Sequence, residues 1–115
     1  MVNSAYYTTG IGSAYGKIVT GVVTVATAGT AVQFTTVSTP IPGVWVAGDA
    51  QATASFFAIG DANVNATLGS QQGIIVIPGQ QSLFIPINDL SLLWVDADQN
   101  SGDLAYAYLQ PFDNL

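Results

Sequence analysis

The chain contains no histidine, cysteine, arginine or glutamate, and its single basic side chain is Lys17. Most enzymatic proton transfer, nucleophile activation and metal ligation use these residue types. The groups left for chemistry are seven aspartates, one lysine and the hydroxyls of Ser, Thr and Tyr. The composition therefore predicts a protein that is not an enzyme and needs no cofactor, and whose function is to fold and to associate.

Charged residues are also scarce, at 7% of the chain, against about 25% in an average soluble protein. A free monomer normally covers its surface with charges of both signs. This surface must instead consist of small polar side chains and some apolar ones, which suits contact with other protein. The low charge therefore predicts a subunit of an assembly.

The formal net charge of −6 excludes several partner classes. With Lys17 alone there is no basic patch to hold a phosphate backbone, so no nucleic acid is expected as partner. No membrane partner is expected either, because no apolar run approaches the roughly 18 residues that span a bilayer. The first residues lack the basic start and apolar stretch of a signal peptide, so we expect assembly in the cytoplasm.

Val, Ile, Thr and aromatic residues dominate, whereas strong helix formers are rare and no segment has helical periodicity. Glycine and proline divide the chain into about eight strand-like runs: 17–26, 30–37, 44–47, 55–59, 74–77, 82–87, 92–96 and 104–109. The pattern predicts an all-β domain over residues 17–110, an antiparallel β-sandwich or a jelly roll. Runs 74–77 and 82–87 are read as returning on each other, and the last two runs as a hairpin, whereas the strand order stays open.

Runs 74–77 and 92–95 are apolar at every position, whereas an antiparallel strand with one wet face alternates. Both faces of such a strand need a cover. We expect that cover to come from the rest of the domain or from a neighbouring subunit.

Residues 1–16 form a separate segment rich in Gly, Ser, Thr and Tyr, and residues 111–115 form a short tail. The segment is either a frayed terminus or an arm that orders on a partner. Tyr6, Tyr7 and Tyr15 favour the arm, because a tyrosine ring offers large contact area while its hydroxyl tolerates water. These three tyrosines are the predicted partner-binding residues.

The stretch 96–103 offers oxygen ligands at alternating positions and begins as an EF-hand loop does. Ser101 then replaces the required glycine and Ala107 the bidentate glutamate, so a polar hairpin loop is the favoured interpretation over a Ca²⁺ site. Asp96 and Asp98 would also lie about 6.5 Å apart on one strand face, near the spacing of some glycosidase carboxylates. A wet hairpin end would leave both ionised, so catalysis there is not expected.

Three other patterns have simpler explanations. The glycine-rich stretch 10–16 lacks the preceding strand and following helix of a phosphate loop. Asn65-Ala66-Thr67 matches a glycosylation pattern that would require secretion. Trp45, Trp94, Tyr106 and Tyr108 could stack on a sugar, although core or interface packing is the favoured role.

Several strand and turn motifs recur in an order that resembles small β-structured virion proteins of tailed bacteriophages, including decoration (cement) proteins and head or tail fibre domains. The motifs are Gly29-Thr30-Ala31-Val32-Gln33-Phe34, Ser38-Thr39-Pro40, Val44-Trp45-Val46, Ile59-Gly60-Asp61, Gly73-Ile74-Ile75-Val76-Ile77-Pro78-Gly79, Ile87-Asn88-Asp89-Leu90-Ser91 and Trp94-Val95-Asp96-Ala97. The resemblance covers roughly residues 18 to 109, and its motifs carry no chemistry.

This resemblance implies a homotrimer on the capsid exterior that binds the major capsid protein and clamps neighbouring copies of it. It places the chain in the virion. The alternative that it leaves open is a fibre or surface module that recognises a glycan or a host receptor.

Overall fold

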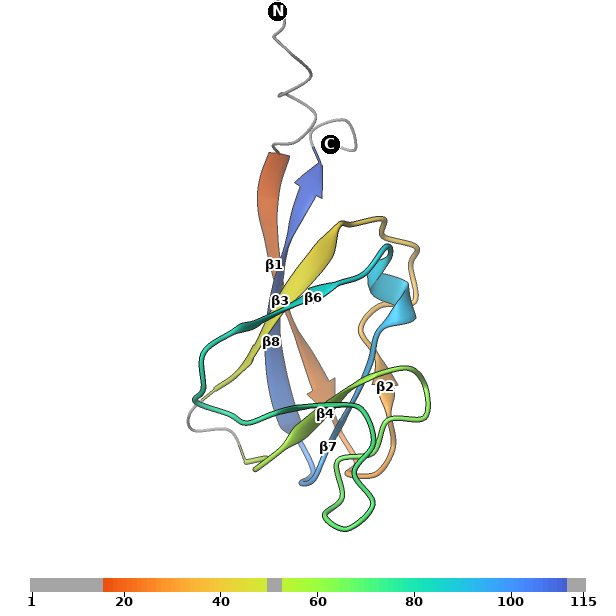
Figure 1. Ribbon diagram of the computed structural model, residues 1–115, viewed down its shortest axis with the longest axis vertical. Coiled ribbons are helices and arrows are strands. Elements are labelled where there is room, and N and C mark those ends of the chain that lie inside the picture. Colours follow the sequence, from red (N-terminus) through yellow and green to blue (C-terminus); the bar gives the residue numbers. More distant parts are fainter. Residues whose placement is uncertain (1–15, 50–52, 112–115) are drawn as a thin grey trace, which may run out of the picture.

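The computed structural model describes residues 16–49 and 53–111. Tyr6, Tyr7 and Tyr15 and the tail after residue 111 lie outside the described residues. The eight strands are β1 (Gly16–Val25), β2 (Val32–Gln33), β3 (Gly43–Gly48), β4 (Phe57–Gly60), β5 (Ile74–Val76), β6 (Leu83–Pro86), β7 (Trp94–Ala97) and β8 (Gly102–Pro111). One 3₁₀ turn, η1 (Leu90–Leu92), precedes β7. The predicted all-β class is confirmed (Figure 1).

The strands form two four-stranded antiparallel sheets, with the orders β1-β8-β3-β6 and β2-β7-β4-β5. The pairs β1·β8, β2·β7, β3·β6 and β4·β5 are nested, as if one long hairpin had been folded at β4–β5 and rolled up. This connectivity is that of a jelly roll. It settles the strand order that the sequence left open.

Every connection except β4–β5 passes from one sheet to the other. The two predicted hairpins are therefore wrong. Strand β7 lies in one sheet and β8 in the other, and the same is true of β5 and β6. The segments 98–101 and 77–82 cross from one sheet to the other. Turn residues favour a reversal of the chain, but they do not determine whether the next strand pairs in the same sheet or joins the opposite one.

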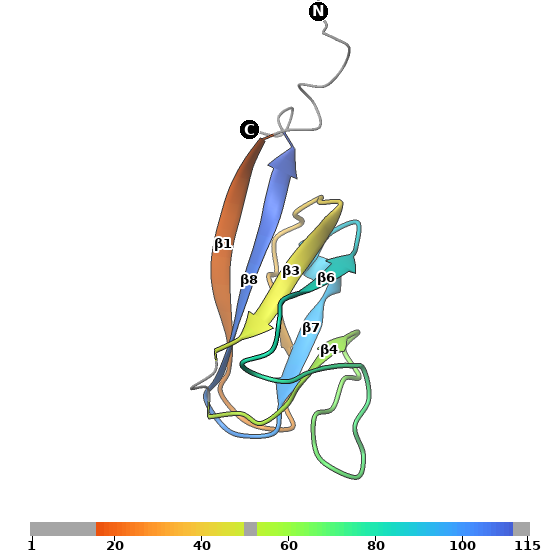
Figure 2. The same ribbon diagram turned by 60° about the vertical axis from the view of Figure 1, so that its left-hand side comes forward.

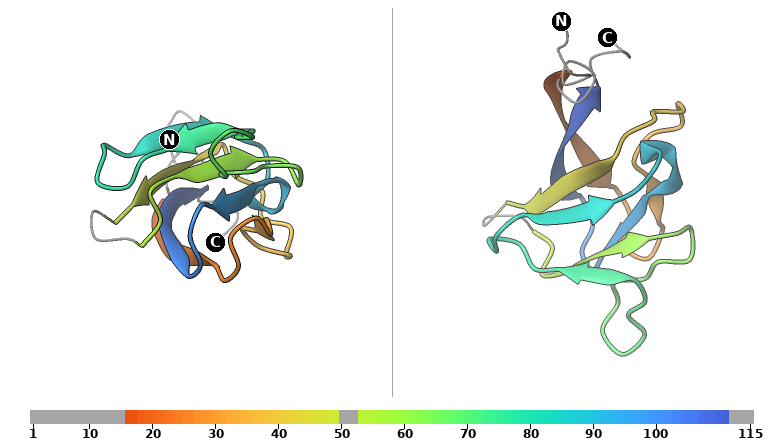
Figure 3. Two further views of the ribbon diagram at one scale, coloured as in Figure 1. Left: turned by 90° about the horizontal axis from the view of Figure 1, so that it is seen from below. Right: turned by 45° about the horizontal axis from the view of Figure 1, so that its top comes forward.

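Strands β1 and β8 form a long ribbon in which ten residue pairs face each other, from Gly16↔Pro111 to Val25↔Gly102. Gly16 and Pro111, assigned above to the arm and the tail, are the end residues of this ribbon. Strand β3 pairs with β8 only between Leu104 and Tyr108, so the end of the ribbon beyond Tyr108 extends past the rest of the sandwich (Figures 2 and 3). Both described chain ends lie at this end of the molecule.

The core lies between the sheets and consists of aliphatic side chains with Phe34 and Phe57. The largest fully buried side chains include Ile59, Leu90 and Leu104. Tyr106 packs beside Phe34, with ring centroids 5.5 Å apart. Its ring also covers Gly21, the residue opposite it on β1, because a Cβ at Gly21 would lie 2.5 Å from the Tyr106 ring.

Strand β2 is much shorter than the predicted run 30–37. Beyond Gln33 the hydroxyl of Thr35 accepts the N–H of Val37 at 3.2 Å, and the hydroxyl of Thr39 donates to the Val37 carbonyl at 2.9 Å. Such local bonds from threonine side chains replace ladder bonds and turn the chain away from the sheet.

The apolar run 74–77 is only partly covered within one chain. Val76 is buried, whereas Ile74 and Ile77 remain about half exposed. In the other run, Leu93 and Val95 are buried and Leu92 is exposed. Within the described part of the chain, the structure contains no helix long and apolar enough to cross a membrane.

Candidate functional site: an apolar sheet face

The aspartates were the main candidates for chemistry, and Asp96 is the most buried of them. It lies on β7 with no exposed surface. Its Oδ1 accepts the N–H of Gly29 and its Oδ2 accepts the N–H of Ala66, each at 2.9 Å. The carboxylate therefore joins the β1–β2 loop to the β4–β5 loop. The interpretation as a wet hairpin end is wrong for Asp96, because these two loops cover it.

Asp98 holds one further loop, between β3 and β4, and Asn100 holds the β1–β2 loop a second time. Asp98 Oδ1 accepts the N–H of Ser55 at 2.7 Å and that of Phe56 at 3.0 Å. Asn100 Oδ1 accepts the N–H of Ala28 at 2.9 Å. The stretch 96–103 thus directs its oxygens to backbone donors of three different loops and not to one centre. Among the described residues, no group of three or more His, Cys, Asp or Glu side chains could hold a metal ion.

Asp89 has the corresponding role near the opposite end of the sandwich. Its Oδ1 accepts the N–H groups of Thr39 and Ser91 at 2.8 and 2.9 Å, and the Ser91 hydroxyl at 2.7 Å. Its Oδ2 accepts the Ser38 hydroxyl at 2.7 Å. The pKa of Asp89 lies well below its usual range, because these donors stabilise the ionised carboxylate. The Ser38 hydroxyl has the largest effect, followed by the Thr39 and Ser91 donors. Asp89 also caps η1, so it fixes both this turn and the β2–β3 loop.

A surface suited to a function is the outer face of the sheet β1-β8-β3-β6. Residues such as Val23, Leu104 and Val46 point into the core, so the residues between them point outward. These outward side chains are Ile18, Thr20, Val22, Trp45, Ala47, Phe84, Ala105, Ala107 and Leu109. None of them is charged, although the same alternation also points Thr24 and Asp103 outward at the loop end of the sheet. We call this set the outer face.

The outer face carries a ridge and a groove side by side. The ridge is formed by Trp45 and Phe84, which are opposite each other on β3 and β6. Their ring centroids lie 4.7 Å apart, and they are 44% and 42% exposed. The groove, of about 520 Å³, runs over Ala105 and Ala107 and is bounded on the β1 side by Val22, which is 63% exposed.

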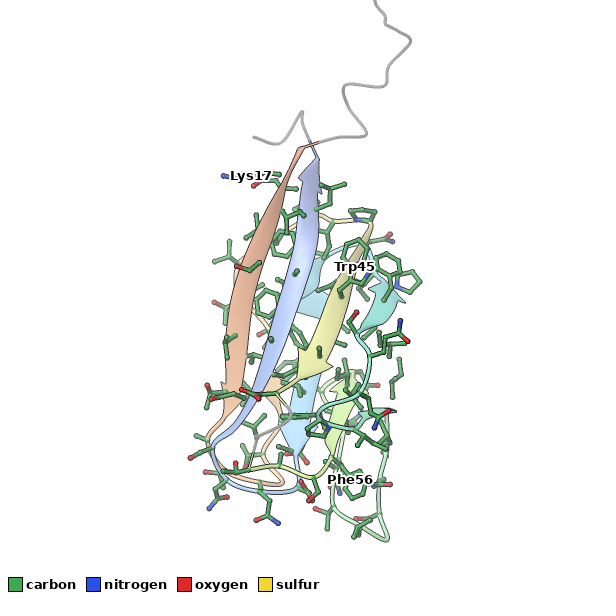
Figure 4. The ribbon with its side chains drawn as sticks, turned by 90° about the vertical axis from the view of Figure 1, so that its left-hand side faces the viewer. Lys17, Trp45 and Phe56 are labelled. Atoms are coloured by element: carbon green, nitrogen blue, oxygen red, sulfur yellow. The ribbon has the colours of Figure 1, made fainter. Side chains whose placement is uncertain are left out.

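Charged residues stand around the middle of this face, and two of them, Asp49 and Asp103, line a second hollow with Val22, Ala47 and Ala105. Lys17 faces Gln110 near the ribbon end. Asp103 faces Thr24 at the loop end and accepts the Thr24 hydroxyl at 2.6 Å. In Figure 4, Lys17 and Phe56 mark opposite ends of the molecule, and Trp45 lies between them. The middle of the face is therefore uncharged and mostly apolar, with the Thr20 and Ser82 hydroxyls at the groove.

The tryptophans and tyrosines considered as a sugar platform are not on one surface. Trp94 is half buried and packs against the small cluster of Ala58, Val64 and Ala66. Tyr106 and Tyr108 point inward and stack on each other, with centroids 6.3 Å apart. Trp45 is the exception, because it stands open on the outer face.

Sequence reasoning did not identify Phe84, Ala105 or Ala107 as site residues. A signal for the alanines was present in Ala105-Tyr106-Ala107-Tyr108, where small and aromatic residues alternate and thus occupy opposite faces of a strand. Likewise, Val44 and Val46 on either side of Trp45 indicate that Trp45 points outward, because successive residues of a strand face opposite sides. Comparisons with protein-family models, with curated proteins and with solved structures found no match for this chain.

Replacing Asp96 by alanine should lower the free energy of unfolding by about 3 kcal/mol, because the Ala66 N–H would remain buried without an acceptor and a second bond would be lost. Asp96→Asn should also be strongly destabilising, because its amide NH₂ would face one of the two N–H donors without an acceptor. Urea denaturation measures both values. Asp61→Ala is the matched control, because it removes an exposed acceptor of the Asn63 N–H. Equal losses for Asp96→Ala and Asp61→Ala would contradict the structural role of Asp96.

Asp89 should make the protein sensitive to acid. Because its pKa is lowered in the folded state, its contribution to stability is complete above its unfolded pKa of about 3.9 and is lost as the pH falls below that value. We expect Asp89→Asn to lower the melting temperature at pH 7 and to weaken its dependence on pH below about 4. Thermal unfolding followed by circular dichroism between pH 2 and pH 7 tests this. A variant with an unchanged acid transition would show that Asp89 does not contribute to it.

Proposed function

We propose that the protein is a non-enzymatic structural subunit of a tailed-phage virion, a homotrimeric decoration protein that binds the capsid exterior and clamps neighbouring major capsid proteins. The observation that carries this proposal is the outer face, an exposed and mostly apolar sheet surface on a chain with few charged residues. Apolar patches of this kind on a soluble domain mark sites of association.

The hydrogen bonds of the aspartates also support a non-enzymatic role. Asp89, Asp96 and Asp98 each accept two or more hydrogen bonds from loops, so their oxygens hold the fold. A general acid or base needs a carboxyl group that faces a substrate. These carboxylates are directed instead to the protein's own backbone N–H groups and hydroxyls.

The fold is compatible with this role but does not select it, because jelly rolls occur in both capsid and lectin domains. The resemblance of the strand and turn motifs to phage decoration proteins favours the capsid role over the lectin role. A subunit that binds only the completed lattice stabilises that lattice by linkage, and three joined copies bind with avidity. Tyr6, Tyr7 and Tyr15 are proposed to contact the capsid.

Particles of the phage that encodes this chain provide the direct test. Antibodies raised against the purified domain should label intact particles on their outside, as seen by gold labelling in the electron microscope. Purified protein should also rebind to particles from which it has been removed, whereas a chain without residues 1–15 should fold but not rebind. Particles that lack the protein would overturn the proposal, and rebinding of the shortened chain would overturn the role of the tyrosines.

A second function, recognition of a glycan, is favoured by one observation: Trp45 and Phe84 form an exposed aromatic pair beside the hydroxyls of Thr20 and Ser82. Aromatic faces of this kind can stack on sugar rings. If this is the function, the protein should give hits on a glycan array, and Trp45→Ala should remove them without a change in melting temperature. Leu68→Ala, at an exposed loop position, is the control. An array without hits would contradict this second function.

A further inference from the structure

The two sheets have four edge strands, and three of these are poor sites for a further strand to pair. Strands β2 and β5 are only two and three residues long, and β6 has four residues, the last of which is Pro86. Short edge strands and proline are features by which natural proteins prevent pairing with another segment. Three edges of the sandwich are therefore protected.

The fourth edge strand, β1, has neither of these features. It is ten residues long, contains no proline, and carries one charge, that of Lys17. In an antiparallel pair, alternate residues turn their N–H and C=O groups away from the partner strand. Strand β1 pairs with β8 on one side, and within the described part of the chain no strand pairs with the other side. We call this other side the free edge of β1.

One end of β1 is supported by β8 alone. Strand β3 does not pair with β8 beyond Tyr108, so the last part of the β1–β8 ribbon has only two strands (Figure 2). A pair of strands by itself is at best marginally stable in water. Ile18, on this part of β1, is 72% exposed. A third strand at the free edge would satisfy backbone groups of β1 and stabilise the ribbon.

The chain has a segment of suitable length that leads into this edge. Fifteen residues precede Gly16, the residue at the ribbon end of β1. Residues 10–15, which include Gly10 and Gly12, have a length common for a connection between neighbouring elements. Residues 2–9 contain five β-branched or aromatic side chains and no proline or charge. As a strand, these eight residues would span about 26 Å of the roughly 33 Å of β1.

Residues 1–16 have no regular alternation of apolar and polar side chains, so their sequence alone does not indicate a strand. Alternation arises where one face of a strand is buried and the other faces water. Along the ribbon end no second sheet packs against the added position, because the ribbon extends past the sandwich. A mixture of Ser, Thr and Tyr is therefore compatible with a strand at this edge.

We propose that residues 2–9 pair as an antiparallel strand with the free edge of β1 in the same chain, so that this sheet has five strands. The short connection gives the segment a high effective concentration at its own β1. Successive residues of a strand face opposite sides, so either Tyr6 or Tyr7 lies on the side of the outer face. The pairing rests on the free edge and does not require that the protein binds a capsid.

Hydrogen exchange of single backbone amides, followed by NMR, tests the pairing. The β1 amides that do not bond to β8 should exchange at least about tenfold more slowly in the full chain than in a chain without residues 1–15. The amides of β6, the other edge strand of this sheet, are the matched control and should exchange equally in both chains. Equal exchange of the β1 amides in the two chains would overturn the proposal.

Cross-linking shows which copy provides the strand, because the chain has no cysteine of its own. In the double variant Asn3→Cys/Val22→Cys, a bismaleimide should join the two thiols within one chain, which then runs as a monomer on a denaturing gel. Asn3→Cys/Leu68→Cys is the control and should stay unlinked, since Leu68 lies in the exposed loop between β4 and β5. Covalent oligomers, an unlinked double variant, or equal linking of the control pair would each overturn pairing within the chain.

Discussion

The fold depends on aspartate side chains that accept hydrogen bonds from the backbone of loops far away in the sequence. A jelly roll moves the chain repeatedly from one sheet to the other, and each crossing leaves backbone N–H groups without a ladder partner. Asp96 satisfies two such groups, 67 and 30 residues away from it, at a position that water does not reach. Asp98 and Asp89 do the same for other crossings. A chain with few charges therefore uses several of them inside its own structure.

This use of the carboxylates explains why the protein's surface chemistry is so limited. With no histidine, cysteine, arginine or glutamate, and with these aspartates bound to loops, the prominent feature of the described surface is the apolar outer face. Sheet faces that are exposed and uncharged are unfavourable in water and favourable in contact with protein. The exposed outer face is thus the physical basis of the proposal that the protein acts by association.

The sequence was sufficient to predict the strands but not their arrangement. Alternating β-branched residues and frequent Gly and Pro located all eight strands, because these are local properties of the backbone. The pairing of β7 with β2 and β4, in place of β8, depends on how the layers stack, which no local residue encodes. For the same reason the burial of Asp96 could not be predicted, since its donors lie in two distant loops. The outward position of Trp45 was readable from its valine neighbours, whereas the groove required the register of three strands.

The central claim is that copies of this protein associate through the outer face, and the mass of the purified protein in solution tests it most directly. Light scattering after gel filtration, at neutral pH and over a range of concentrations, gives that mass without a label. The account predicts a trimer, three times the chain mass of 11.9 kDa. A single species of 11.9 kDa at the highest concentration would contradict it.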